Sequence, residues 1–164
     1  MVACPACIGP QHFCATDVPA RFVAEGVGVL VANGRRAAWL SGDLDAERET
    51  RLAMAQPGLR ADLLVAPHHG SASSSSPVLL NTLRPSVVLI QLGYRNRFGH
   101  PAPLVLDRYR ERALLWVASP HCGAASWRSD QPHRVACHRG QARRYWHHTG
   151  AGEALVGGEV DPDS

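Results

Sequence analysis

Short apolar runs alternate with polar, helix-forming segments along the middle of the chain, and this alternation restricts the possible folds more than any other feature. Residues 26–40 form the pattern of two strands joined at Asn33-Gly34, a dipeptide typical of tight hairpins. Three further strand-like runs and three helical segments then alternate. The strand-like runs are 61–67, 86–93 and 114–120, and the helical segments are 41–54, 76–85 and 102–113. The order predicts an α/β layer arrangement.

Length and composition are those of one globular domain. The chain has 164 residues, of which 45% are hydrophobic and 19% are charged, so the composition excludes a disordered protein. No run of 18 apolar residues is present, and the first fifteen residues lack the pattern of a signal peptide. We therefore expect the chain as given to be soluble. The expected organisation is an irregular segment over 1–25, a folded domain over 26–148 and a flexible acidic tail over 149–164.

Basic residues are concentrated in the second half of the chain. Residues 95–148 contain ten Arg and three acidic residues, whereas the last sixteen residues contain four acidic residues and no basic one. A basic face is the usual electrostatic footprint of a phosphate-rich partner, although many basic segments are only solvated surface. The distribution predicts contact with DNA that involves Arg95 and Arg97.

Metal-binding residue types follow three of the predicted strands. Asp43 follows the strand that ends at Leu40, the His68-His69 pair follows the next strand, and His100 follows the third. Sites in open α/β sheets form in the loops beyond the carboxyl ends of strands. Imidazole nitrogen and carboxylate oxygen suit zinc or manganese, which lowers the pKa of bound water toward about 7. The pattern predicts a site in which Asp43, His68, His69 and His100 bind metal and Asp43 and His69 are catalytic.

Each of these residues also has a structural interpretation. Asp43 could cap the helix that begins beside it. The His68-His69 pair could belong to an ordinary polar turn, and His100 could be a loop histidine. Asp45 is expected to face solvent on the helix. The serines that follow the histidine pair could form a flexible linker, although a linker is unusual between a buried strand and a helix.

Four segments resemble one known family in their order and spacing. They are "WLSGDLDAERE", "ADLLVAPHHGSASSSS", "GYRNRFGHP" and "RRYWHH". From about Val27 to Trp146 the chain resembles the C-terminal metallo-β-lactamase-like domain of ComEC-type competence proteins. The resemblance implies an αββα fold and a nuclease activity on incoming DNA. It also implies a parent protein in the inner membrane, with a membrane channel portion as partner and this domain outside the cytoplasm.

The resemblance assigns roles to individual residues. Asp43 matches the bridging carboxylate of the family, and His68 or His69 and His100 match the later histidines of the metal site. Asn96 matches the loop asparagine that accompanies the last histidine. The expected cofactor is zinc or manganese. The residues expected to contact the substrate are Ser71, Arg95, Asn96 and Arg97.

One motif of the family is missing. Its first metal-binding loop, of the type H-x-D-x-D-H, has no counterpart in residues 1–42, where His12 is the only histidine. We therefore expect the C-terminal half of the αββα sandwich, with an exposed apolar sheet face and a hydrolase site that is inactive alone. Two alternatives remain open. The chain could be a non-catalytic DNA-contacting module that uses its Arg-rich segment 95–148, or a truncated gene product without function.

Overall fold

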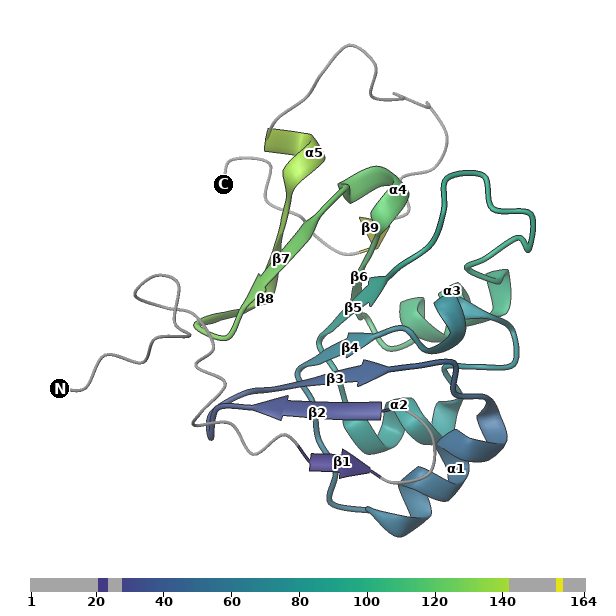
Figure 1. Cartoon of the computed structure of the whole chain (residues 1–164), viewed down its shortest axis with the longest axis vertical. Coiled ribbons are helices and arrows are strands. Elements are labelled where there is room, and N and C mark those ends of the chain that lie inside the picture. The colour runs from purple at the N-terminus through teal and green to yellow at the C-terminus, as the bar shows by residue number, and fades with distance from the viewer. Residues whose placement is uncertain (1–20, 24–27, 142–155, 158–164) are drawn as a thin grey trace, which may run out of the picture.

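The computed structural model describes residues 21–23, 28–141 and 156–157. The strands are β1 (Arg21–Val23), β2 (Gly28–Ala32), β3 (Ala37–Ser41), β4 (Leu63–Val65), β5 (Val87–Ile90), β6 (Leu115–Ala118), β7 (Ala125–Arg128), β8 (Gln131–Cys137) and β9 (Val156–Gly157). The helices are α1 (Ala46–Ala55), α2 (Pro77–Leu83), α3 (Pro103–Arg110), α4 (Ser119–Cys122) and α5 (His138–Gln141), with a 3₁₀ turn, η1 (Pro67–Gly70). Seven strands form one sheet in the order β1-β2-β3-β4-β5-β6-β9, and β7 and β8 pair separately (Figure 1).

The sheet is mixed, and its centre is parallel. Strands β2 and β3 form an antiparallel hairpin, whereas β3, β4, β5 and β6 are parallel neighbours. Asn33 shapes the hairpin turn, because its side-chain oxygen accepts hydrogen bonds from the backbone N–H groups of Arg35 (3.1 Å) and Arg36 (2.9 Å). Helices α1, α2 and α3 connect the parallel strands in turn. The predicted α/β order is confirmed.

Helix starts follow local capping chemistry. Asp45 caps α1 by accepting a hydrogen bond from the backbone N–H of Arg48 at 2.9 Å. Ser76 caps α2 in the same way through Leu79, and Pro77 occupies the first helical position. The alternative that Asp43 caps this helix is therefore wrong, and Asp45, which stays partly exposed, is the cap. Since Asp45 caps α1, Asp43 is left outside the helix.

One face of the sheet packs against the three connecting helices. Trp39, Leu64, Val88 and Trp116 lie side by side across the four parallel strands, and all four are buried. They belong to one apolar cluster with side chains of α1, α2 and α3, which lie on the same side of the sheet (Figure 1). Successive residues of a strand point to opposite faces of the sheet, and these four side chains all point to the face that the helices cover.

The opposite face of the sheet packs against the β7-β8 hairpin. Ala38, Leu63, Val87 and Val117 are buried there and form a second cluster with Val135 of β8. The prediction of an exposed apolar sheet face is wrong for these residues. The position of the hairpin across the sheet depends on contacts that are remote in sequence.

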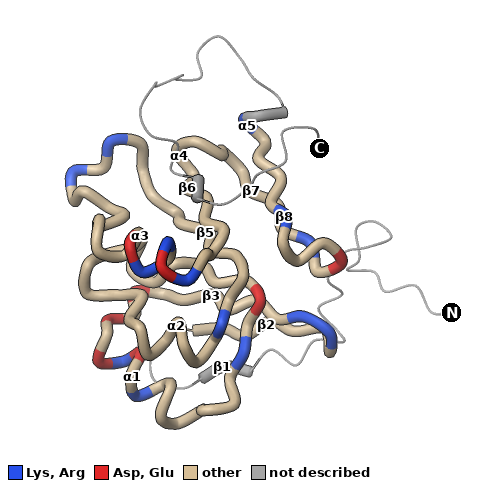
Figure 2. The backbone as a smooth tube through the Cα atoms, turned by 180° about the vertical axis from the view of Figure 1, so that it is seen from behind, with Lys and Arg blue, Asp and Glu red and all other residues tan. Residues whose placement is uncertain are grey.

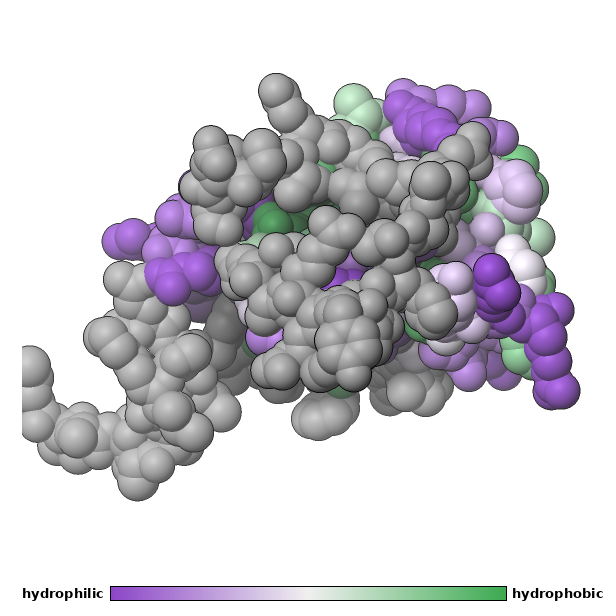
Figure 3. Space-filling view, turned by 90° about the horizontal axis from the view of Figure 1, so that it is seen from above, coloured by the Kyte–Doolittle hydropathy of each residue, from purple (hydrophilic) through white to green (hydrophobic). Residues whose placement is uncertain are grey.

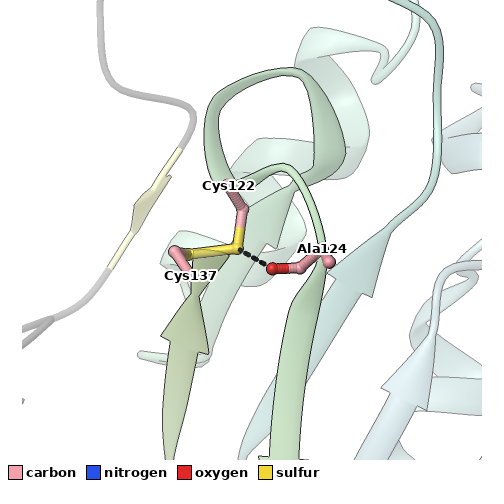
Figure 4. The surroundings of a disulfide bond; sticks show 3 residues. All are labelled: Cys122, Ala124 and Cys137. Carbon is pink, nitrogen blue, oxygen red and sulfur yellow. Dashed lines mark hydrogen bonds between the residues drawn. A yellow bond between two sulfur atoms is a disulfide. The ribbon is translucent and has the colours of Figure 1, made fainter. Parts of the chain in front are cut away.

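A disulfide bond joins Cys122 at the end of α4 to Cys137 at the end of β8 (Figure 4). The two Cα atoms are 4.6 Å apart, and the residues are 15 positions apart in sequence. Cys122 is buried, and its Sγ atom lies 3.6 Å from the carbonyl oxygen of Ala124. The bond fixes the hairpin to the end of β6 through α4.

Both ends of the large sheet carry short strands outside the expected domain core. β1 falls within the predicted irregular segment 1–25, and β9 falls within the predicted flexible tail 149–164. Each pairs with a strand, β2 or β6, whose backbone groups on that side would otherwise have no sheet partner. The segment "RRYWHH" lies outside the described residues. Among the residues that the structure describes, no helix is long and apolar enough to cross a membrane.

Candidate functional site

The carboxyl ends of β3, β4 and β5 bring the predicted metal-binding residues to one edge of the sheet. Asp43 lies two residues beyond β3, His68 and His69 lie in η1 after β4, and His100 lies in the loop after β5. The Nε2 atom of His69 is 3.9 Å from Oδ1 of Asp43. The rings of His68 and His100 meet edge to face, with centroids 6.2 Å apart. The parallel register of the strands therefore places these four residues together.

His69 is oriented by a hydrogen bond from its other ring nitrogen. Nδ1 lies 2.7 Å from the carbonyl oxygen of Gln91, and a carbonyl oxygen can only accept. Nδ1 therefore carries a proton, and Nε2 is the ring nitrogen that faces Asp43. A metal cation between Nε2 of His69 and Oδ1 of Asp43, which lie 3.9 Å apart, would be bound by both atoms. The hydrogen bond to a backbone carbonyl is the usual arrangement for a metal-binding histidine.

The histidine turn has an unusual backbone. Three consecutive residues have positive φ angles: 47° at His68, 54° at His69 and 79° at Gly70. This left-handed conformation costs non-glycine residues roughly 1–2 kcal/mol each. The turn is held by two backbone hydrogen bonds, from the N–H of His68 to Gly42 (3.2 Å) and from the N–H of Ser71 to the carbonyl of His68 (2.9 Å). Strain of this kind concentrates at functional sites.

Gly70 is the point at which the histidine turn meets the loop of His100. A Cβ atom at position 70 would lie 2.8 Å from Cβ of Pro101, which is closer than such atoms can approach. The N–H of Ala102 donates a hydrogen bond to the carbonyl of Gly70 at 2.9 Å. The glycine in the "HHG" motif therefore permits both the left-handed backbone and the contact between the two loops.

His100 is held by Asn96 and has an unsatisfied ring nitrogen. Asn96 accepts a hydrogen bond from the N–H of His100 at 2.9 Å and donates one to its carbonyl oxygen at 2.7 Å. Nδ1 of His100 is buried and has no hydrogen-bond partner among the residues that the structure describes. Burial, together with the neighbouring rings of His68 and His69, holds the pKa of His100 below its ordinary value. The ring is therefore neutral near pH 7, which is the form that binds a metal.

The serines after the histidine turn are not a flexible linker. Ser74, Ser75 and Ser76 are buried, and the hydroxyl of Ser74 donates to the carbonyl oxygen of Pro67 at 2.8 Å. The carboxylate of Glu49, which is fully buried, accepts the N–H groups of Ser75 and Ser76, both at 2.7 Å. The serine run thus anchors the turn that carries the histidines.

Sequence reasoning missed Glu49. The residue lies in a polar stretch of α1, but it precedes the buried Leu52 by three positions and therefore lies on the apolar face of the helix. That spacing was the available signal. Burial raises the pKa of Glu49, while the hydrogen bonds from Ser75 and Ser76 oppose the rise. Glu49 is buried and stabilises the serine run, and it is not one of the residues at the open edge of the sheet.

A second buried contact reaches the serine run from α3. The hydroxyl of Tyr109 lies 2.7 Å from that of Ser75, and burial raises the pKa of Tyr109. Arg108 donates to the carbonyl oxygen of Ser74 at 2.8 Å. The three connecting helices therefore all hold the serine run, α1 through Glu49, α2 through its cap and α3 through these two residues.

Two of the predicted substrate contacts have roles within the loops. Ser71 is half-buried, and its hydroxyl lies 3.1 Å from that of Ser73. The amide group of Asn96 is engaged with His100, so its clearest role is to position that residue. The contact of Ser71 and Asn96 with a substrate stays a prediction.

Arg95 and Arg97 lie on an exposed part of the same loop. The guanidinium of Arg95 is 5.3 Å from the ring centroid of Tyr94, and that of Arg97 is 4.9 Å from the ring centroid of Phe98. The tube in Figure 2 shows basic positions, in blue, on the loop between β5 and α3. Figure 3 shows hydrophilic and hydrophobic residues interleaved on the right-hand side of the molecule seen from above. The guanidinium groups of Arg95 and Arg97 therefore place positive charge beside the sheet edge that carries Asp43, His68, His69 and His100, which we call the histidine edge.

The donor types at the histidine edge fit a zinc or manganese ion. An ion bonded at about 2.0–2.2 Å to each atom spans a separation like that between His69 and Asp43. The unpartnered Nδ1 of His100 is a further potential donor. In the part of the chain that the structure describes, however, no group of three or more His, Cys, Asp or Glu is close enough to hold one ion. The types of donor atom therefore fit zinc or manganese, whereas the number of ligands is below the four that zinc usually has.

Two larger hollows lie away from this edge. One, of about 390 Å³, is lined by the β2-β3 turn, the start of β4 and the end of α2, and the other, of about 450 Å³, adjoins Arg84 and Arg112. Neither includes any of the four residues at the histidine edge. The side chains of His69 and Asp43 are 55% and 72% exposed, so this pair lies on an open edge of the sheet.

Comparison with known proteins identifies the relatives of this chain. No protein-family model matches it. It is 36% identical over 105 residues to competence protein ComA of Neisseria gonorrhoeae, a match that covers 63% of the chain and 14% of ComA. It is 30% identical over 89 residues to ComE operon protein 3 of Bacillus subtilis, covering 54% of the chain and 12% of that protein. The chain carries a ComEC-like domain.

A further relative of this ComEC-like domain is the uncharacterised protein YcaI of Escherichia coli, with 32% identity over 122 residues. That match covers 73% of the chain and 16% of YcaI. The chain thus spans about a sixth or less of the length of these relatives. The family resemblance seen in the sequence is confirmed, and it links the ComEC-like domain to proteins of bacterial competence and DNA uptake.

Proposed function

We propose that this ComEC-like domain takes part in metal-dependent hydrolysis of phosphodiester bonds during DNA uptake. The observation that carries the proposal is the pairing of Asp43 with His69, in which a carboxylate oxygen and an imidazole nitrogen face each other at 3.9 Å at an exposed sheet edge. The name of one relative, competence protein ComA, refers to competence, which supports DNA as the substrate.

The fold supports the same proposal. In a metallo-β-lactamase-like αββα sandwich, each sheet carries helices on its outer face and packs its inner face against the other sheet. The sheet described here has α1, α2 and α3 on one face only. We assign it to one αβ layer of such a sandwich, with the histidine edge as its contribution to the metal site.

Each residue has a part that follows from its position. When bound, zinc or manganese supplies Lewis acidity toward a phosphodiester oxygen. Asp43 and His69 would hold the ion, with His69 oriented by the carbonyl of Gln91. His100 would become a further ligand only if the two loops moved closer together, because it does not form one group with Asp43 and His69 among the described residues. Arg95 and Arg97 would bind the phosphates on either side of the scissile bond. His68 packs against His100 and would fix that ring or replace it as ligand.

The small number of ligands predicts that this chain needs additional residues for hydrolysis. A catalytic zinc site usually has three protein ligands and an open position, and a lost ligand leaves the ion free to move. The family's H-x-D-x-D-H-type loop is the source that we propose for the remaining ligands. The chain alone is therefore expected to bind metal weakly and to cleave no DNA above background.

A complementation experiment tests this function. The chain is joined to the segment of Neisseria gonorrhoeae ComA that precedes the matched region, and cleavage of a fluorescent oligonucleotide is measured with manganese or zinc. We expect cleavage by the joined protein, loss of cleavage in Asp43→Ala, and no loss in Asp107→Ala, which removes an exposed carboxylate on α3. Strong metal-dependent cleavage by the 164-residue chain alone, or an active joined Asp43→Ala variant, would contradict the proposal.

The disulfide bond supports a location for the domain. Structural disulfides persist in oxidising compartments and are rare in the cytosol. The Cys122–Cys137 bond therefore supports the proposal that the domain lies outside the cytoplasm, beside the membrane channel portion of its parent protein. Mass-shift labelling of thiols in freshly lysed cells tests this. Free Cys122 and Cys137 in the parent protein would contradict the proposed location.

A further inference from the structure

The loop after β5 presents two aromatic rings to solvent, each beside an arginine. Phe98 is 67% exposed and Tyr94 is 45% exposed. Arg97 lies over the Phe98 ring at 4.9 Å, and Arg95 lies over the Tyr94 ring at 5.3 Å. Two cation–π pairs therefore stand within five consecutive residues of one surface loop.

This aromatic loop is attached to the candidate metal site. The ring of Phe98 stacks on the ring of His100, with centroids 5.8 Å apart and an angle of 20° between the planes. Asn96 fixes the loop through its two hydrogen bonds with the backbone of His100. Any group that rests on Phe98 is therefore held next to a ring that itself stacks on His100.

Aromatic rings alternating with arginines match the chemistry of an unpaired nucleotide. Each base offers a flat π-face, and each linkage carries one negative charge. Stacking on an exposed aromatic ring needs a base whose face is free, which a single strand provides and a duplex hides. The guanidinium groups of Arg95 and Arg97 supply the charge that the phosphates require.

We propose that Phe98 forms a base-stacking platform that selects single-stranded DNA and sets its position over the histidine edge. This inference rests on the proposed function, to which it adds the strandedness of the substrate and the residues that read it. A base that stacks on Phe98 occupies the place now held by the guanidinium of Arg97. The displaced guanidinium then pairs with the adjacent phosphate.

Binding to defined oligonucleotides tests the platform. Fluorescence anisotropy is measured with the full chain in a chelator, without added metal, so that the result does not depend on hydrolysis. The ligands are an oligothymidine of about 15 nucleotides, an abasic strand of the same length and a duplex. The variants are Phe98→Ala, Phe98→Trp and, as a control, Met54→Ala, which truncates a side chain that is 78% exposed on α1.

We expect Phe98→Ala to weaken binding of oligothymidine about tenfold, which is the range expected for the loss of one stacked base. Phe98→Trp should retain binding, because it keeps a stacking surface, and Met54→Ala should bind as the wild type does. Binding of the abasic strand should not change with Phe98→Ala. The platform is overturned if wild type and Phe98→Ala bind oligothymidine equally, or if the abasic strand or the duplex binds as tightly as oligothymidine.

The outcome is separable from that of the proposed hydrolysis. The platform is tested without metal, whereas hydrolysis is tested by complementation and by Asp43→Ala. Stacking without cleavage would refute only the hydrolase. Cleavage of a duplex that does not depend on Phe98 would refute only the platform.

Discussion

Asp43 and His69 face each other across the ends of two neighbouring parallel strands, with Oδ1 of Asp43 3.9 Å from Nε2 of His69. The carbonyl of Gln91 holds the other side of the His69 ring. The strained histidine turn, the contact at Gly70 and the buried serine run all serve to place His69 at this position. The predictions below test these parts separately.

Metal affinity tests the pairing itself. The chain alone should bind zinc or manganese weakly, and either Asp43→Ala or His69→Ala should lower the affinity about tenfold or more, since each removes one ligand. Competition with a chromogenic chelator provides the measurement. Asp107→Ala is the control. If it lowers the affinity as much as Asp43→Ala does, the metal binds nonspecifically to surface carboxylates.

Salt dependence tests the arginines of the aromatic loop. For single strands the slope of log K against log salt concentration is about −0.7 for each phosphate that is neutralised. The double variant Arg95→Ala/Arg97→Ala should therefore have a slope smaller by about 1.4 than the wild type. Titrations at several salt concentrations measure it. Equal slopes in both proteins would exclude these two residues from phosphate contact.

Replacement of Gly70 tests the contact between the two loops. In Gly70→Ala the alanine has to adopt a positive φ angle, and its Cβ atom lies 2.8 Å from Cβ of Pro101. The free energy of unfolding should fall by about 1–2 kcal/mol or more, as measured by urea denaturation. Gly58→Ala is the matched control, because a Cβ atom at position 58 meets nothing within 4 Å. Similar stabilities of the two variants would contradict the assigned role.

The pH dependence of stability tests Glu49. Burial raises the pKa of this carboxyl in the folded protein above its ordinary value of 4.5. The folded state then binds the proton more tightly than the unfolded state does, so this contribution is complete below pH 4.5 and is lost as pH rises through the raised pKa. Glu49→Gln lacks this contribution. The free energy of unfolding of the wild type should therefore decline relative to that of Glu49→Gln as the pH rises from about 4 toward neutrality.

Equilibrium unfolding at a series of pH values measures this difference. A rise of wild-type stability relative to Glu49→Gln over the same range would mean that the hydrogen bonds from Ser75 and Ser76 outweigh the cost of burial. Glu47→Gln, which changes an exposed carboxyl on the same helix, is the control for general charge effects.

Reduction tests the Cys122–Cys137 bond. The chain-entropy model assigns about 3 kcal/mol to a disulfide that closes a loop of 15 residues. Reductant should lower the free energy of unfolding of the wild type by up to about this amount. The double variant Cys122→Ser/Cys137→Ser should be less stable and insensitive to reductant. A reductant effect of equal size in the double variant would assign the effect to other cysteines.

The sequence by itself determined the features that depend on neighbouring residues. Turn chemistry and periodicity predict the Asn33-Gly34 hairpin, helices within 41–54 and 76–85, and the alternation of strands and helices, whereas the cap of the first helix was not predicted correctly. The strand-end position of Asp43, His69 and His100 was also evident. Parallel strands align their carboxyl ends, and a local pattern was therefore enough to predict that these side chains meet.

Only the tertiary structure decided the features that depend on contacts between distant residues. Glu49 has the sequence context of an exposed helix residue, yet it is buried because the serine run, 26 positions away, brings two backbone donors to it. Cys122 and Cys137 meet because β7 and β8 fold back on each other and lie across the sheet. Such contacts are set by the packing of whole elements, and the free energy that stabilises them is absent from any short stretch of sequence.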